Sequence, residues 1–168
     1  MIDTIWNGWR AAYLAGEGRA AADRAGSVFT QLLESGLPDE DTHIVYRGER
    51  TFAVMNAFPY NPGHLLVLPY AEIPDLEGLD SPTTSELWGT VTAAVSVLKA
   101  VYHPAGVNVG LNLGRAAGGS IAEHLHVHVL PRWHGDANFM TAIAGATTIP
   151  EALPVTAEKI RAAWQSLD

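Results

Sequence analysis

Short apolar or alternating segments dominate the middle of the chain, and they predict β-strands. Side chains alternate between the two faces of a strand, so a period of two or a short apolar run bounded by turn residues is typical of a sheet. The segment 64–69 is apolar almost throughout and is expected to be a central strand. The residues Gly48, Glu49 and Arg50 suggest a hairpin turn between the strands predicted at 44–46 and 51–56. The predicted strands are residues 44–46, 51–56, 64–69, 107–113 and 124–130.

Helical spacing of apolar residues appears before, within and after this region. The long helix is expected to begin with Ser81 as its N-cap and Pro82 in its first turn, and to end before Pro104. Residues 17–27 are expected to be a connector, residues 39–41 a solvated acidic loop, and residues 138–144 a short extended segment. The predicted helices are residues 1–16, 28–33, 81–103 and 156–167. Strands carrying one long crossing helix predict an α+β fold with a mainly antiparallel sheet.

This pattern divides the chain into an N-terminal helix and connector, residues 1–27, and one domain, residues 28–168. Two tryptophans, Trp6 and Trp9, lie on one side of the N-terminal helix and are expected to pack on the domain or on another subunit. A chain of 168 residues with 48% hydrophobic content is long enough for one well-packed core.

The charge and cysteine content narrow the range of functions. The net charge of −8 argues against nucleic-acid binding, which needs a basic surface, but it leaves room for a small phosphorylated ligand held by backbone N–H groups. The chain has no cysteine, so disulfides and thiolate metal sites are excluded. No signal peptide and no membrane-spanning segment is recognisable, which predicts a soluble cytoplasmic protein.

Candidate chemistry is concentrated in residues 123–131, where His124, His126 and His128 alternate with Leu125, Val127 and Val129. In a strand the three imidazoles would share one face and the apolar residues the other. Two kinds of site would use such a row. The rings could bind a metal ion, or one imidazole could act as a nucleophile in phosphoryl or nucleotidyl transfer while the others orient it and handle protons.

The flanking residues make the pattern specific. The order His-φ-His-φ-His-φ-φ, where φ is apolar, continues through Pro131-Arg132-Trp133, and a second motif runs from Asn56 to Pro69. Together with residues 108–112 and 118–120, these motifs resemble the histidine triad (HIT) family over roughly residues 44–140. The Gly-Gly-Ser before the triad and the segment 135–139 are most similar to the short bacterial diadenosine tetraphosphate phosphorylases.

The resemblance implies a HIT fold, with a five-stranded sheet, one long crossing helix and a C-terminal helix, to which residues 1–27 would add an N-terminal helix. It also implies roles for residues in both motifs. His126 would be the nucleophile that carries AMP covalently, His124 would orient its ring, and His128 would contact the phosphates or the leaving group. His64 would touch the same phosphates, and Asn56 would bind the ribose.

Other residues of the motifs are candidates for substrate binding. Asn112 belongs to the strand motif, and Gly119 with Ser120 could offer N–H groups and a hydroxyl to phosphate oxygens. Trp133 is either a platform for a base or a packing residue at the rim. Histidine triad hydrolases often carry a glutamine where Ser120 stands, which favours the phosphorylase branch.

The leading hypothesis is therefore phosphorolysis of diadenosine tetraphosphate to ATP and ADP, with inorganic phosphate as co-substrate. The alternatives are hydrolysis of a dinucleoside polyphosphate or nucleoside phosphoramidate, and nucleotide binding without turnover. No cofactor or metal site is expected, and a requirement for divalent cations is left open. The partners would be nucleotides such as the dinucleoside polyphosphate, AMP or ATP. Because the family builds a ten-stranded sheet from two subunits, a homodimer is expected, or a tetramer if the N-terminal helix adds an interface.

Overall fold

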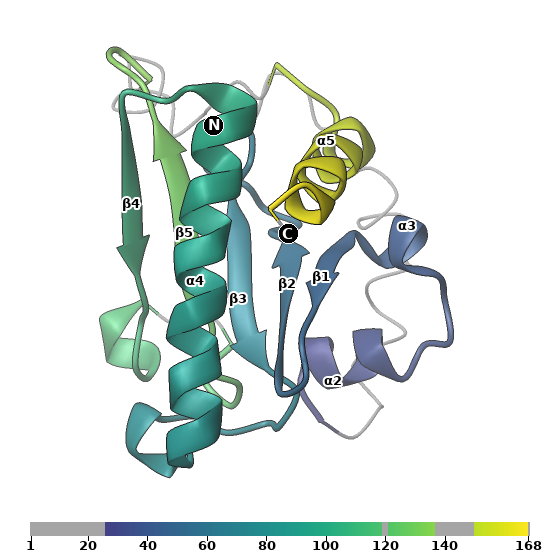
Figure 1. The fold of residues 1–168 in the computed structure, drawn as a ribbon. Coiled ribbons are helices and arrows are strands. Elements are labelled where there is room, and N and C mark those ends of the chain that lie inside the picture. Colours follow the sequence, from purple (N-terminus) through teal and green to yellow (C-terminus); the bar gives the residue numbers. More distant parts are fainter. Residues whose placement is uncertain (1–25, 119–120, 137–149, 168) are drawn as a thin grey trace, which may run out of the picture.

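The computed structural model describes residues 26–118, 121–136 and 150–167, and its strands form one antiparallel sheet. The strands follow the order β1-β2-β3-β5-β4, so the last strand of the chain lies between β3 and β4 (Figure 1). The strands are β1 (Ile44–Arg47), β2 (Thr51–Met55), β3 (Leu65–Pro69), β4 (Gly106–Gly110) and β5 (Val127–Arg132). This arrangement brings the two motifs of the sequence together, because β3 pairs directly with β5 through Leu66 and His128.

The helices begin and end where local chemistry permits. The long helix α4 begins after Asp80, whose carboxylate accepts a hydrogen bond from the N–H of Thr83 at 2.8 Å, and it ends at His103, which has a left-handed backbone with φ of 44°. The described helices are α2 (Val28–Leu33), α3 (Asp39–Thr42), α4 (Ser81–Tyr102) and α5 (Leu153–Gln165), with short 3₁₀ turns at Leu76–Gly78 and Arg115–Ala117.

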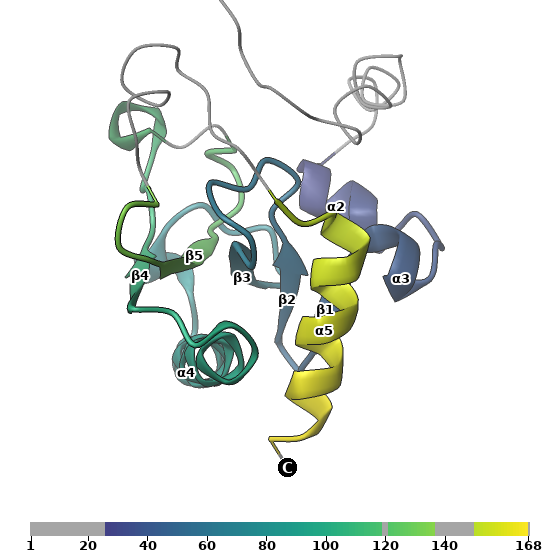
Figure 2. The ribbon, with the colours of Figure 1, turned by 90° about the horizontal axis from the view of Figure 1, so that it is seen from above.

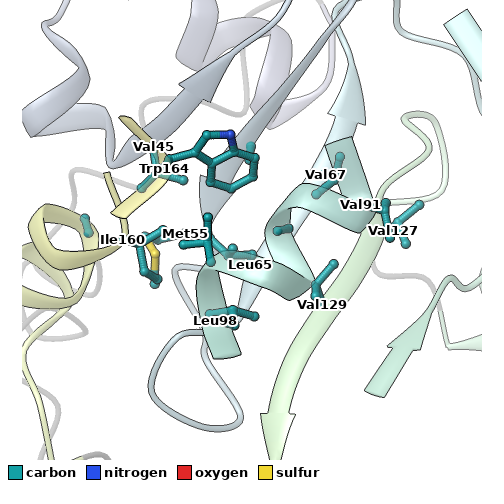
Figure 3. Close-up of a cluster of buried hydrophobic side chains, with 14 of the residues drawn as sticks. Val45, Met55, Leu65, Val67, Val91, Leu98, Val127, Val129, Ile160 and Trp164 are labelled. Atoms are coloured by element: carbon teal, nitrogen blue, oxygen red, sulfur yellow. The ribbon is translucent and has the colours of Figure 1, made fainter. Parts of the chain in front are cut away.

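The main core lies between one face of the sheet and the helices α4 and α5. Val127 and Val129 of β5 pack there together with Leu98 of α4 and Ile160 of α5 (Figure 3). A smaller apolar cluster lies on the opposite face, where Phe29 of α2 packs among side chains of β1, β2 and β3. Viewed along the edge of the sheet, α4 and α2 lie on opposite sides (Figure 2). The sheet is therefore covered on both faces, and α2 belongs to the folded body.

The α+β fold predicted from the sequence, with a five-stranded antiparallel sheet, one long helix and a C-terminal helix, is confirmed with several local corrections. The acidic residues 39–41 form helix α3 rather than a loop, because Pro38 leads into the helix and acidic side chains are favourable in a first turn. The long helix is capped by Asp80 rather than by Ser81. The C-terminal helix begins at Leu153, three residues earlier than expected, with Pro154 in its first turn.

The strand that carries the histidines begins later than predicted. It starts at Val127, so His124 and His126 precede it and only His128 lies within it. The physical reason is that this segment bonds to the chain after β3 before it enters the sheet, for example through the N–H of Leu125 and the carbonyl of Ile73 at 2.8 Å. The predicted helix at 1–16 and the extended segment at 138–144 lie outside the described residues. Among the helices of the described part of the chain, none is long and apolar enough to span a membrane.

Candidate active site

The alternation of the histidine motif survives although its first half is not a strand. Leu125, Val127 and Val129 are buried in the main core beneath α4. His126 and His128 face the opposite side of the sheet, where they line a cleft. His124 is fully buried beside this cleft, next to the ring of Phe29 at a centroid distance of 5.4 Å. The apolar row thus anchors the segment, and two of the imidazoles line the cleft.

The contacts of His124 fix the position of its hydrogen atom. Its Nε2 lies 2.9 Å from the carbonyl oxygen of Pro69, which can only accept, so Nε2 carries the hydrogen. Nδ1 is then the acceptor for the hydroxyl of Ser27 at 2.7 Å. Both ring nitrogens are satisfied inside the protein, which leaves His124 no free atom for a ligand. His124 is therefore placed to orient its neighbours rather than to react.

His126 is oriented by the backbone of His124. Its Nδ1 lies 2.8 Å from the carbonyl oxygen of His124, so Nδ1 must be the donor. In the neutral ring the lone pair is then on Nε2, the nitrogen for which no intramolecular hydrogen bond is seen among the described residues. The imidazole is thus held in the tautomer that a nucleophile requires.

His128 receives the opposite arrangement from His64. The Nδ1 of His64 accepts a hydrogen bond from the N–H of Tyr60 at 3.2 Å, so its hydrogen is on Nε2. That Nε2 donates to Nδ1 of His128 at 2.9 Å. In a neutral ring, the hydrogen of His128 must then be on its Nε2. Beside the nucleophilic lone pair of His126, at a ring-centroid distance of 5.1 Å, the cleft therefore has an N–H donor.

The surroundings favour neutral imidazoles at these positions. Burial lowers the pKa of His64 to about 3, and electrostatic repulsion from the neighbouring rings of His128 and His126 contributes in the same direction. Burial also lowers the pKa of His124 and of His128 below the ordinary value. These three rings are therefore neutral near pH 7, and the hydrogen-bond assignments above hold at that pH.

The cleft has a volume of about 340 Å³, within the usual range for small-molecule sites of roughly 300–1,000 Å³. Its described walls carry no lysine or arginine, so an anionic ligand would meet neutral N–H groups there instead of cations. The lining residues come from the loop before β3, from β3 itself, from the turn before the triad and from the triad: Asn56, Phe58, Tyr60, Leu66, Asn112, Gly118, Ile121, His126 and His128.

Comparison with known proteins agrees with this geometry. The profile of the HIT domain matches residues 38–135. The chain belongs to the HIT family. It is 45% identical to the AP-4-A phosphorylase of Mycobacterium tuberculosis, over 98% of this chain and 85% of that protein. It is also 32% identical to the asymmetrical bis(5'-nucleosyl)-tetraphosphatase of Schizosaccharomyces pombe, over 63% of this chain and 57% of that enzyme.

Solved structures of HIT proteins superimpose on the chain. A zinc-bound histidine triad family protein from Mycobacterium smegmatis matches with a TM-score of 0.70 at 25% identity, over 85% of this chain and 96% of that one. A HIT-like protein from Bartonella henselae matches with a TM-score of 0.68 at 26% identity, over 84% and 99% of the two chains. The structure of a uridylyltransferase mutant shares only the fold, with a TM-score of 0.71 at 18% identity over 94% of this chain and 53% of that one.

Most of the HIT residues singled out in the sequence gather at the cleft. Asn56 and Asn112 line it, and the side-chain oxygen of Asn56 accepts a hydrogen bond from the N–H of Phe58 at 2.9 Å. His64 lies behind the cleft wall, where its ring contacts Asn56, Tyr60 and His128 of the lining. Gly119 and Ser120 lie outside the described residues, whereas their neighbour Gly118 lines the cleft. Whether these residues bind substrate stays a prediction.

Trp133 is placed elsewhere. Its ring lies near that of Tyr102, at a centroid distance of 6.1 Å, and both line a separate hollow of about 480 Å³ with Glu151. The structure thus does not bring Trp133 to the histidine cleft, and its stacking on a base has no support from this arrangement. The reason is strand geometry, because Trp133 follows the far end of β5 from the triad.

Several residues of the HIT cleft were not singled out from the sequence as site residues. Phe58 and Tyr60 are 45% and 60% exposed, and Tyr60 lies nearly parallel to His128 with a centroid distance of 6.3 Å. Both fall inside the motif that begins at Asn56, so exposed aromatics in a motif loop were the available signal. Ser27, the contact of His124, had no such signal because it lies 97 residues away in sequence.

The metal alternative raised by the three histidines does not fit the ring contacts. Nδ1 of each ring is engaged with a different partner, and His124 has no nitrogen left for a ligand. Within residues 26–118, 121–136 and 150–167, no group of three or more His, Asp or Glu side chains is arranged to hold a metal ion. The arrangement instead suits a covalent step at phosphorus with one nucleophile and one neighbouring proton donor.

Proposed function

We propose that this HIT protein is a dinucleoside tetraphosphate phosphorylase, which converts diadenosine tetraphosphate and inorganic phosphate to ATP and ADP. The observation that carries this proposal is the 45% identity with the AP-4-A phosphorylase, because it extends over 98% of the chain and is not confined to the shared motif. The site geometry fits the reaction, since the cleft combines an imidazole lone pair with an N–H donor.

The first step would be attack by Nε2 of His126 on an α-phosphorus of the substrate. A nitrogen–phosphorus bond forms, and the bond from that phosphorus to the bridging oxygen of the departing ATP breaks. The N–H of His128 is the donor nearest to the nucleophilic ring, and it would hydrogen-bond or protonate that oxygen. The carbonyl of His124 stabilises the positive charge that develops on the His126 ring.

The second step would transfer AMP from His126 to inorganic phosphate. A phosphate oxygen attacks the same phosphorus, the nitrogen–phosphorus bond breaks, and ADP leaves while His126 returns to its starting state. Splitting the reaction in this way lets phosphate compete with water only at the second step. Because the transition states of phosphoryl transfer are loose in most analyses, positioning and charge stabilisation would supply most of the rate.

Substrate contacts in this proposal come from the residues around the two histidines. Asn56 would bind the ribose, and Asn112 would contribute to the opposite wall of the cleft, which both residues line. Gly119 and Ser120 would hold the acceptor phosphate through N–H groups and the hydroxyl. His64, whose ring is fully buried, would act through its hydrogen bond to His128.

A product assay tests the proposal directly. The protein is incubated with diadenosine tetraphosphate, with and without inorganic phosphate, and the nucleotides are separated by chromatography. ATP and ADP formed only with phosphate are the expected result. ATP and AMP formed equally well without phosphate would identify a hydrolase, and binding without any product would identify a nucleotide-binding module.

The covalent step has its own test. His126→Ala should lower turnover by roughly 10⁴-fold or more, as for other covalent nucleophiles. His134→Ala is the matched control, because His134 is an exposed histidine outside the cleft, and it should turn over as the wild type does. An adenylyl group on His126 should be found by mass spectrometry after an alkaline quench in the absence of phosphate. Full activity of His126→Ala would refute the mechanism.

The chain is also proposed to form a homodimer in the cytoplasm. Strand β4 is an edge of the sheet, and its residues Asn108, Val109 and Gly110 are exposed. An uncovered edge that carries an apolar side chain such as Val109, 44% exposed, is a ready site for pairing with a second copy. A tetramer built through the N-terminal helix stays a prediction.

A further inference from the structure

A polar cluster at the start of α2 touches the triad from outside the motifs discussed so far. Ser27 is the N-cap of α2, and its side chain is almost completely buried at 1% residue exposure. Its hydroxyl accepts a hydrogen bond from the N–H of Thr30 at 3.2 Å and donates one to Nδ1 of His124 at 2.7 Å. A single hydroxyl thus caps the helix and fixes a triad ring.

Glu72 ties this cap to the chain that follows β3. Its carboxylate accepts hydrogen bonds from the N–H of Ser27 at 2.7 Å and from the hydroxyl of Thr30. These bonds lower the pKa of Glu72, so the carboxylate is ionised near pH 7. The preceding residue, Gly26, has φ of +89°, and a Cβ there would lie 3.1 Å from the same carboxylate. The turn into α2 is therefore shaped around the Glu72 contact.

The last residue of β3 and the loop that follows it hold the triad from the other side. The carbonyl of Pro69 accepts a hydrogen bond from Nε2 of His124, and the carbonyl of Ile73 accepts one from the N–H of Leu125. His124 is thus held between this loop and Ser27, with every polar atom of its ring used. Its own carbonyl is the group that orients His126.

We propose that Ser27, held in place by Glu72, is a positioning residue for nucleotidyl transfer, acting through His124 on the ring of His126. This inference rests on the proposed function for its kinetic consequence, while its structural consequence can be observed without substrate. The hydroxyl of Ser27 holds His124 in the tautomer with hydrogen on Nε2. In that tautomer, Nε2 of His124 donates a hydrogen bond to the carbonyl of Pro69. This bond fixes His124 so that its own carbonyl lies against Nδ1 of His126. Nε2 of His126 then carries the lone pair that faces the cleft.

Removing the hydroxyl should loosen this chain of contacts at its first link. In Ser27→Ala, Nδ1 of His124 becomes a buried acceptor without a partner, which favours rotation of the ring or a change of tautomer. The carbonyl of His124 is then free to move, and His126 is no longer restricted to one tautomer. Loss of outer hydrogen bonds to functional imidazoles in metal sites typically costs about 10- to 100-fold. We expect a decrease of that size in kcat, with KM changed less than threefold.

Two variants, one in α2 and one just after its end, separate positioning from loss of the helix cap. Leu33→Ala removes a half-buried apolar contact of α2 with the smaller core, and so weakens the docking of the helix without touching His124. Ser35→Ala removes an exposed serine hydroxyl that bonds the carbonyl of Leu32 after the end of α2. The proposal predicts that both variants keep kcat within about twofold of the wild type at a temperature where all are folded. An equal loss of kcat in Leu33→Ala and Ser27→Ala would overturn it.

Nitrogen-15 NMR of the imidazole rings supplies the second measurement, on the ligand-free protein. Wild type and Leu33→Ala should show His124 with hydrogen on Nε2 and His126 with hydrogen on Nδ1, whereas Ser27→Ala should show mixed tautomers for both rings. Wild-type tautomers in Ser27→Ala would overturn the proposal even if kcat fell. If the wild type turned over no dinucleoside tetraphosphate, the proposed function would fail, and the ring spectra would still decide whether Ser27 positions the two histidines.

Discussion

Acidification should destabilise this protein through His64, the ring that is buried behind the cleft. Burial, and then the neighbouring rings of His128 and His126, lower the pKa of His64 from 6.5 to about 3. The folded protein therefore keeps this ring neutral at pH 5, whereas the unfolded chain binds a proton there below pH 6.5. The stability that depends on a neutral His64 is complete above pH 6.5 and decreases as the pH falls from there towards 3.

The size of this effect follows from the shift. Each pH unit between 6.5 and 3 should remove about 1.4 kcal/mol from the free energy of unfolding, or roughly 2 kcal/mol at pH 5. His124 and His128 also have lowered pKa values, so they add to the loss in the same direction. Replacing His64 by glutamine removes only its own share, because glutamine does not titrate.

Urea unfolding followed by tryptophan fluorescence at pH 7 and pH 5 measures this share. The decrease in the free energy of unfolding between the two pH values should be about 2 kcal/mol smaller in His64→Gln than in the wild type. Leu65→Ala is the control, since this buried neighbour should destabilise the protein by about 2–5 kcal/mol at both pH values and retain the wild-type difference between them. An equal pH dependence in His64→Gln and wild type would refute the assignment of a neutral, buried His64.

Two further predictions concern the backbone before β3 and the assembly. Gly63→Ala should lower the free energy of unfolding by about 1–3 kcal/mol in urea titrations, because Gly63 has φ of +81° and a Cβ there would lie 2.9 Å from Cε2 of Tyr102; wild-type stability would contradict this. Gly36→Ala is its control for backbone strain alone, since φ is +70° but no atom lies within 4 Å of the added Cβ, and it should cost less. Light scattering should give a dimer for the wild type and a monomer for Val109→Lys, and a dimer in both would place the interface away from β4.

Local patterns were sufficient for the architecture and for the choice of triad residues. Alternation in a nearly extended segment decides which side chains share a face, and this held for Leu125, Val127 and Val129 even though the strand begins only at Val127. The motif from Asn56 to Pro69 and the triad motif were both expected at one site. The pairing of β3 with β5 brings them there.

Contacts between distant parts of the chain could not be predicted from the sequence pattern. No hydrogen-bond partners for the three rings followed from the sequence, whereas the structure gives each ring a different set of partners. His128 takes its tautomer from a ring 64 residues away, and His124 from a serine 97 residues away that had been assigned to the connector. Trp133, close to the triad in sequence, lies at a different hollow.

The sequence by itself determined the fold class, the family and the nucleophile candidate, because strand periodicity and motif spacing are properties of neighbouring residues. Only the tertiary structure decided which nitrogen of each imidazole carries its hydrogen. That choice depends on carbonyl, hydroxyl and ring partners that folding brings within about 3 Å from separate segments, and hydrogen bonding is sensitive to such distances.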